Sequence, residues 1–134
     1  MFVFIMNNNT IKNFSKLKNA SCLGKEIVFL SSNLNSSLKL YLNFLYNEGL
    51  IQGFHFDSKN LYFNVRLRSF QQKPLITNIK IFSTPFFNHF ISFAELNFLN
   101  SRAKLFLFST NKGLLTLLEC KKQRVGGKLL FYVN

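Results

Sequence analysis

Apolar residues recur at helical spacing in two segments of the first half of the chain. Between residues 10 and 19, Ile11, Phe14 and Leu17 fall three positions apart while lysines take the other side, which predicts a short amphipathic helix. A second segment has apolar residues at positions i, i+3, i+4 and i+7, namely Leu38, Tyr41, Leu42 and Leu45. Gly49 follows it and supplies a helix stop. The pattern therefore predicts two helices that each bury one face.

Runs with strand character accompany these helices. Residues 27–30 form a continuous apolar run, as a buried strand does. Residues 50–56 and 61–67 flank a polar turn, and in the second run apolar residues alternate with polar ones. The two runs predict a hairpin. The first half of the chain is therefore expected to be α-β-α-β-β, with the helices on one side of a small sheet.

The segment Gln71-Gln72-Lys73-Pro74 marks a change in composition, and its proline ends a strand. We therefore expect two small lobes, an N-terminal α/β lobe over residues 1–72 and a C-terminal mostly-β lobe over residues 73–134. The strand-like runs of the second lobe are residues 75–82, 105–108 and 128–133, and a short helical turn is expected at residues 94–96. The predicted fold class is α+β.

Composition narrows the class of protein. The 134 residues include 17 Lys and Arg against 5 Asp and Glu, a formal charge of +12, and 48% of them are hydrophobic. Such apolar content excludes a disordered basic tail, and such charge points to an acidic partner. The 18 Phe residues, with many Asn, Lys and Ile, favour an AT-rich genome such as that of an organelle.

The sequence contains few residues suited to catalysis or to metal binding. Five scattered acids and two histidines, His55 and His89, provide no carboxylate pair and no nucleophile next to a base. Structural zinc takes its ligands in close pairs, and the two cysteines and two histidines are not so spaced. We expect no enzyme, no cofactor, no metal site and no small-molecule substrate.

Two further expectations concern the cysteines and membranes. Cys22 and Cys120 lie far apart in the sequence, and reduced, buried thiols are expected at both positions. The longest uncharged stretch, residues 81–94, is shorter than the ~20 residues of a membrane span, so no membrane insertion is expected.

Two segments with small side chains and neighbouring cations lie in the second lobe. Ser109-Thr110-Asn111-Lys112-Gly113 offers short donors and acceptors for sugar hydroxyls, phosphates or a base edge. Taken alone, the segment is more typical of an ordinary polar turn. Gly126-Gly127-Lys128 follows a basic cluster that includes Lys121 and Arg124. Together the two segments favour a surface that lies against a nucleic-acid backbone.

These residues resemble the C-terminal lobe of the S8 family of small-subunit ribosomal proteins. The family has S-T-S-K-G, a later Gly-Gly pair and a Tyr-Val ending, which Ser109–Gly113, Gly126-Gly127 and Tyr132-Val133 match. Ser83-Thr84-Pro85 is similar to the family's S-R-P, and Lys16-Leu17-Lys18-Asn19-Ala20 to its R-I-R-N-G. The resemblance covers roughly residues 10–134.

The resemblance implies a structural constituent of the small ribosomal subunit, with neighbouring small-subunit proteins as partners. It implies direct binding to the central domain of small-subunit rRNA, with support for rRNA folding, subunit assembly and translation. The rRNA contacts it implies are Ser109, Thr110, Asn111, Lys112, Gly113, Gly126 and Gly127 in the second lobe, and Lys16, Lys18 and Asn19 in the first. The cations Lys121, Arg124 and Lys128 complete the predicted contacts.

The sequence departs from the family's pattern at several positions. Asn111 replaces a serine, Lys128 stands where the family usually has Glu and would seek a phosphate instead, and Thr84 and Asn88 replace arginines. Such drift favours an organellar ribosome with altered rRNA. We expect the mitochondrial matrix, with a plastid as the alternative.

Two other functional interpretations remain open at this point. A generic single-stranded nucleic-acid-binding protein would use aromatic side chains as stacking platforms, which requires Phe86, Phe87 and Phe90 to face solvent. A peripheral membrane protein would be drawn to anionic lipid by charge and Phe.

Overall fold

The computed structural model describes residues 8–31, 37–99 and 105–134. The chain divides into two compact units, Asn8–Asn78 and Ile79–Asn134. The division thus falls later than residue 72, where the sequence pattern placed it. The reason lies in the segment that follows Pro74: Ser21 Oγ donates a hydrogen bond to Ile76 O (2.7 Å), and Ile76 is buried. Residues 73–78 therefore pack with the first helix as part of the N-terminal unit.

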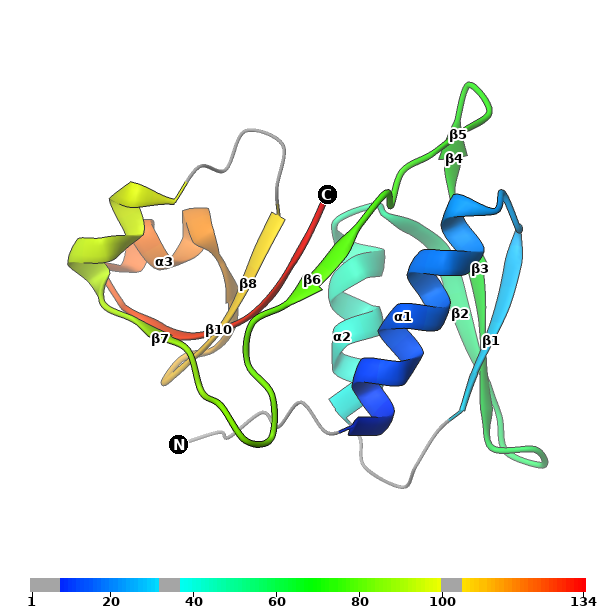
Figure 1. Cartoon of the computed structure of the whole chain (residues 1–134), viewed down its shortest axis with the longest axis horizontal. Coiled ribbons are helices and arrows are strands. Elements are labelled where there is room, and N and C mark those ends of the chain that lie inside the picture. The colour runs from blue at the N-terminus through cyan, green and yellow to red at the C-terminus, as the bar shows by residue number, and fades with distance from the viewer. Residues whose placement is uncertain (1–7, 32–36, 100–104) are drawn as a thin grey trace. The chain divides into compact units, whose positions relative to one another are not determined.

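The N-terminal unit is a layer of two helices on a three-stranded antiparallel sheet. Figure 1 shows α1 (Asn8–Cys22) and α2 (Ser37–Asn47) on the same side of the sheet. The strand order is β1 (Ile27–Ser31), β3 (Tyr62–Leu67) and β2 (Ile51–Asp57), and a short pair, β4 (Ser69–Phe70) and β5 (Lys73–Pro74), follows. The element order confirms the predicted α-β-α-β-β arrangement.

Alternation along the strands determines which face of this sheet is buried. Val28 and Leu30 of β1 and Phe63 and Val65 of β3 are at most 5% exposed, and their neighbours point the other way. The helices contribute the buried residues Phe14, Leu17, Ala20, Leu38, Tyr41, Leu42 and Leu45. Within the described residues of this unit, no helix covers the opposite face of the sheet, where Phe29 and Tyr62 are exposed (Figure 1).

The C-terminal unit is built on a larger antiparallel sheet. Its strands run in the order β6 (Ile79–Ile81), β10 (Gly127–Val133), β8 (Leu105–Thr110) and β9 (Gly113–Thr116), and β7 (Phe90–Ile91) also pairs with β10. The 3₁₀ helix η1 (Phe93–Phe98) and helix α3 (Leu117–Gln123) contribute to one core cluster with the sheet. That cluster comprises Ile91, Leu96, Phe106, Phe108, Leu115, Leu117, Cys120 and Leu129. The α+β class is confirmed.

Helix α3 was not predicted from the sequence, in which Lys121 and Arg124 were interpreted only as members of a basic cluster. A capping box begins it: Thr116 Oγ1 accepts a hydrogen bond from Glu119 N (3.3 Å), and Glu119 Oε2 accepts one from Thr116 N (3.1 Å). The T-x-x-E spacing was the available signal. Among the residues described here, no helix has the length and apolar run needed to cross a membrane.

Candidate nucleic-acid interface

The turn between β8 and β9 is shaped from within by Thr110. Its Oγ1 donates a hydrogen bond to Gly113 O (3.0 Å) and accepts one from Lys112 N (3.1 Å), and the residue is 5% exposed. Gly113 has φ +102°, a conformation that favours glycine. The predicted loop therefore separates into a framework, Thr110 and Gly113, and two exposed turn residues, Asn111 and Lys112.

The Gly126-Gly127 pair allows close packing at the start of β10. A Cβ on Gly127 would lie 2.5 Å from Ser109 O, and one on Gly126 would lie 2.6 Å from Ile91 O. Both contacts are with backbone, which cannot move aside cheaply. The glycines thus hold the start of β10 against the end of β8 and the β7–η1 segment. The sequence analysis gave the pair only a role in RNA approach, and the structure adds this packing role.

Strand register brings three candidate side chains together on the sheet. Lys128 is the direct partner of both Phe90 on β7 and Ser109 on β8. Directly opposite residues share a face, so Phe90, Lys128 and Ser109 form one row, here called the C-terminal row. Leu129, next to Lys128 on β10, belongs to the core cluster, and so does Phe108, next to Ser109 on β8. The row therefore lies on the face opposite that core.

The C-terminal row combines an aromatic ring, a cation and a hydroxyl. Phe90 is 68% exposed, and Ser109 and Lys128 are half-buried. Partial burial lowers the pKa of the Lys128 ammonium, because desolvation disfavours its charged form. A phosphate beside Lys128 would favour the charged form again and oppose this shift. The row is thus chemically suited to a nucleotide, with a ring for the base and a cation for the phosphate.

The other predicted cations of this unit lie near the end of α3. Lys121 is half-buried in the last turn of the helix. Arg124 is exposed at the C-cap in the left-handed conformation (φ 56°, ψ 46°), and its backbone N–H donates to Cys120 O and Lys121 O. These two residues lie just before the glycine pair in the chain and are not members of the C-terminal row.

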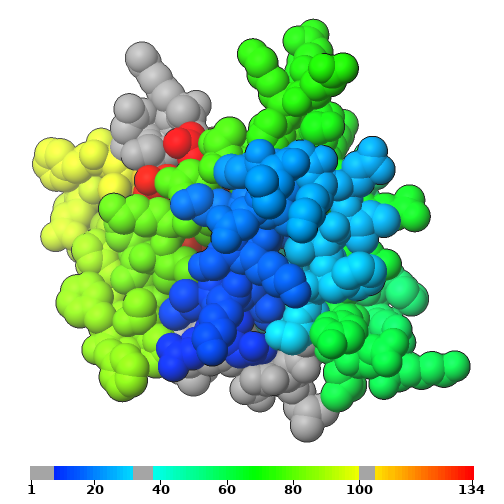
Figure 2. All heavy atoms as spheres, turned by 45° about the vertical axis from the view of Figure 1, so that its right-hand side comes forward, coloured from blue at the N-terminus to red at the C-terminus, as the bar shows by residue number. Residues whose placement is uncertain are grey.

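The three residues predicted on α1 do not form one patch. Lys16 and Asn19 are exposed and three positions apart, so they share a helix face. Lys18 is half-buried, and successive helical steps of about 100° turn it away from Lys16. Figure 2 shows the surface of α1, in blue, open on one side of the molecule. This exposed surface of α1 therefore does not gather the predicted cations Lys16 and Lys18 on one face.

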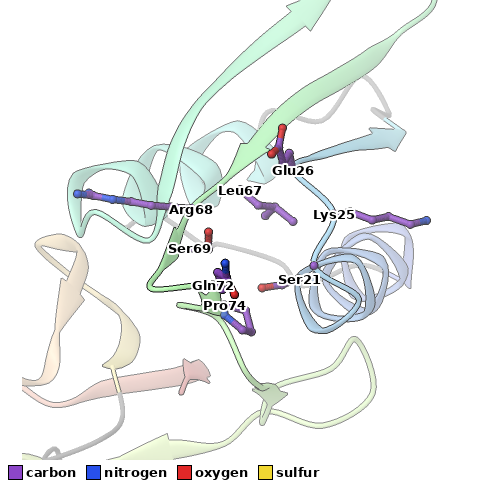
Figure 3. A pocket seen from close by; sticks show the side chains of 9 residues that line it. Ser21, Lys25, Glu26, Leu67, Arg68, Ser69, Gln72 and Pro74 are labelled. Atoms are coloured by element: carbon purple, nitrogen blue, oxygen red, sulfur yellow. The ribbon is translucent and has the colours of Figure 1, made fainter.

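A hollow of about 250 Å³ lies between the end of α1 and the β4–β5 hairpin of the N-terminal unit. Figure 3 shows Lys25 and Arg68 pointing away from one another and out of the hollow. Arg68 Nη1 instead donates a hydrogen bond to Gly49 O (3.3 Å), and the Ser21 hydroxyl is bonded to Ile76 O. Among the residues that line this hollow, no nucleophile stands beside a general base.

The expectation for the cysteines is wrong at one position. Cys120 is fully buried in the core cluster, and burial together with the nearby Glu119 raises the pKa of its thiol to about 11. Cys22 is exposed, because it is the last residue of α1 and lies beyond the helix's buried face. Within the described ranges, no group of three His, Cys, Asp or Glu side chains could hold a metal ion.

The aromatic residues before β7 face solvent. Phe86 is 93% exposed and Phe87 is 60% exposed, in a turn closed by hydrogen bonds between the backbones of Thr84 and Phe87. The fully buried Ser83 anchors this turn: its hydroxyl donates to Leu129 O (2.5 Å) and accepts from His89 N (3.2 Å). The condition stated for a stacking platform is therefore met.

Comparison with known proteins shows which family the chain resembles. A family model described as ribosomal protein S8 matches residues 9–134. The small ribosomal subunit protein uS8 of Borreliella burgdorferi (strain ZS7) is 32% identical over 120 residues, covering 87% of this chain and 89% of that protein. The protein uS8c of Anthoceros angustus is 29% identical over 134 residues (96% and 99% covered), and uS8m of Acanthamoeba castellanii 35% over 96 residues (69% and 74%).

The fold and these matches define a small-subunit ribosomal protein, with a structural role rather than an enzymatic one. Within that class, the chain belongs to the ribosomal protein S8 family.

Proposed function

We propose that this protein binds small-subunit rRNA directly through the C-terminal row and the adjoining turn. By doing so it supports folding of the central rRNA domain, assembly of the subunit and translation in an organelle. The observation that carries the proposal is the strand register. It sets Ser109 and Lys128, from two segments predicted separately, opposite one another with an exposed Phe90 beside them.

Each group of the site has a distinct task in this proposal. The Phe90 ring stacks on an unpaired base, and the Ser109 hydroxyl bonds a base edge or a ribose 2′-hydroxyl. Lys112 and Lys128 neutralise phosphates. Thr110, Gly113, Gly126 and Gly127 hold these groups in place through the hydrogen bonds and close contacts already described. Asn111, exposed at the turn, reaches farther than the serine it replaces.

The remaining predicted contacts add affinity around the site. Lys121 and Arg124 extend positive charge from α3 toward the glycine pair. On the N-terminal unit, Lys16 and Asn19 present one face of α1, and Lys18 supplies charge on another.

The relatives and the composition support an organellar location. The relatives include uS8c and uS8m proteins, whose suffixes mark chloroplast and mitochondrial forms, as well as bacterial ones. We assign the protein to the mitochondrial ribosome, with the plastid ribosome as the alternative. Sedimentation of the protein with small subunits from purified mitochondria supports this assignment, and sedimentation only with plastid subunits contradicts it.

The test of the function is a binding measurement with a fragment of the organism's own small-subunit rRNA. We expect tight binding whose affinity falls steeply with salt, by a log–log slope of about −0.7 to −0.9 per neutralised phosphate. At matched salt, an unrelated folded RNA of equal length should bind more weakly. Equal affinity for both RNAs contradicts recognition of rRNA.

A second candidate is supported by the exposed Phe86, Phe87 and Phe90. A generic single-strand binder would stack bases on these rings and would prefer unstructured RNA to the folded fragment. Replacing all three rings with serine would then abolish binding to unstructured and folded RNA alike. In the rRNA proposal only Phe90 affects binding to the folded fragment.

A further inference from the structure

The outer face of the N-terminal sheet carries a second row of side chains that the proposed function does not use. Asn64 on β3 is the direct partner of Phe29 on β1 and of His55 on β2. These three residues, here called the N-terminal row, share the face opposite Val28 and Val65, which are buried. Phe29 is 53% exposed. The row therefore presents a ring, an amide and an imidazole on an open sheet.

The N-terminal row lines a hollow of about 540 Å³. Tyr62 and Asp57 line one end of it, and Lys16 reaches it from α1. The volume lies within the range of about 300–1,000 Å³ that small-ligand sites occupy. The hollow is thus large enough for a nucleobase, with a cation at its rim.

One buried polar atom in the hollow lacks a partner. Asn64 Oδ1 is shielded from solvent and accepts no hydrogen bond from the described residues. A buried acceptor left in this state destabilises the fold, because its hydrogen bond with water is lost and not replaced. Because Oδ1 is shielded, the Asn64 amide must turn toward the hollow to meet an incoming base. An exocyclic amine would then supply the missing donor, whereas an apolar side chain from a neighbouring protein would leave the atom unsatisfied. This difference favours a nucleobase as the occupant.

The charges around the hollow favour RNA as well. Its one lining carboxylate, Asp57, is engaged in the adjacent turn, where its oxygens accept hydrogen bonds from Lys59 N (3.0 Å) and Asn60 Nδ2 (3.1 Å). The exposed Arg66 lies two residues after Asn64 on β3, and therefore on the same sheet face as the row. Lys16 lies at the rim of the hollow. Both cations are available to phosphates on either side of a bound base.

We propose that the N-terminal row binds one unpaired nucleobase of small-subunit rRNA. The base stacks on Phe29, the Asn64 amide bonds its edge, and Lys16 contacts the adjoining phosphate. This inference rests on the proposed function, since it names rRNA as the source of the base, and it adds a second contact region with its own chemistry.

The experiment uses the full-length protein, a ten-nucleotide unstructured RNA carrying 4-thiouridine and, in parallel, the folded rRNA fragment. We expect ultraviolet crosslinks from the ten-mer to peptides of β1 or β3. Phe29→Ser should weaken ten-mer binding about tenfold through the lost stacking. The matched control is Phe70→Ser: this ring belongs to the same unit, is 66% exposed and lies outside the row, so affinity should stay within about twofold. Asn64→Leu should weaken binding while the melting temperature confirms folding.

Three results would overturn the inference: crosslinks confined to Phe86–Phe90, equal effects of the two Phe variants, or loss of a neighbouring ribosomal protein from reconstituted particles with ten-mer binding intact. The last result would assign the face to a protein partner.

Specific binding of the folded fragment is measured separately on the unchanged protein. If that binding is specific and the ten-mer result is negative, this inference alone fails. If the fragment is not preferred, the proposed function fails first, and the rRNA assignment of this row fails with it.

Discussion

The two units carry the same formal charge but organise their candidate residues differently. Residues 8–78 contain nine Lys and Arg against three Asp and Glu, and residues 79–134 contain eight against two, so each unit carries +6. In the C-terminal unit, strand pairing joins Phe90, Lys128 and Ser109 in one row. In the N-terminal unit, the predicted residues of α1 point in different directions. Charge therefore favours the proposed RNA partner for both units alike, whereas strand register distinguishes the C-terminal unit by gathering its candidate residues into one row.

The two rows also differ in chemistry. The C-terminal row has a cation at its centre, whose lowered pKa reflects partial burial, and it suits a phosphate beside a base. The N-terminal row has an amide at its centre, with an acceptor that lacks a partner, and it suits a base edge. An open antiparallel sheet can thus present either recognition chemistry, depending on one central side chain.

The largest expected effect tests whether the units are separate. Phe108→Ala and Phe14→Ala each remove a ring that is at most 1% exposed, one from each core. Each should lower the free energy of unfolding by about 3–5 kcal/mol. Hydrogen exchange should show lost protection mainly within the unit that carries the substitution. Equal loss in both units would mean that they unfold as one, and the comparison between them would lose its basis.

The next effect concerns the glycine that positions the C-terminal row. Gly127→Ala places a Cβ 2.5 Å from Ser109 O and should cost about 1–3 kcal/mol of stability through the strain of overpacking. Gly53→Ala in the N-terminal unit is the matched control, because no atom lies within 4 Å of its added Cβ. Chemical denaturation measures both variants. Similar losses would show that the close packing around Gly127 carries no special strain.

Binding measurements distinguish a contact made by the C-terminal row from one made by charges dispersed over the surface. Ser109→Ala with Lys128→Ala should weaken binding to the rRNA fragment about tenfold or more, since a charge-assisted contact and a hydrogen bond are lost. Lys128→Ala alone should reduce the salt slope by about 0.7–0.9. Lys18→Ala, a half-buried lysine outside both rows, should reduce affinity less than the double variant. The reverse order would place the main contact on α1.

The smallest effect concerns the thiols. At pH 8 a thiol reagent should modify Cys22 quickly and Cys120 only after unfolding, because Cys120 is buried and its pKa of about 11 keeps it protonated. Mass spectrometry of labelled peptides measures this, and Cys22→Ser should leave stability within about 0.5 kcal/mol. Rapid labelling of Cys120 in the folded protein would show that the C-terminal core opens more readily than its packing indicates.

Sequence reasoning succeeded where one periodicity covered a whole element. The residues Phe14 and Leu17 repeat on one helix face, and the 61–67 run alternates, so both elements are present as predicted. It failed at α3, whose seven residues span about two turns, too few for a helical period to show against the neighbouring strand. Only the capping spacing of Thr116 and Glu119 distinguished it. The extra residues of the N-terminal unit, 73–78, depend on a contact with Ser21 that is remote in sequence.

The sequence by itself determined the class of fold, the basic surface, the family resemblance and the two segments of the candidate interface, because these depend on local spacing and residue type. Only the tertiary structure decided that Phe90, Lys128 and Ser109 form a row, that Thr110 and the glycines support it from within, and that Phe29, Asn64 and His55 form a second row. The physical reason is that strand register joins residues distant along the chain, and a shift of one residue would turn each side chain to the other face.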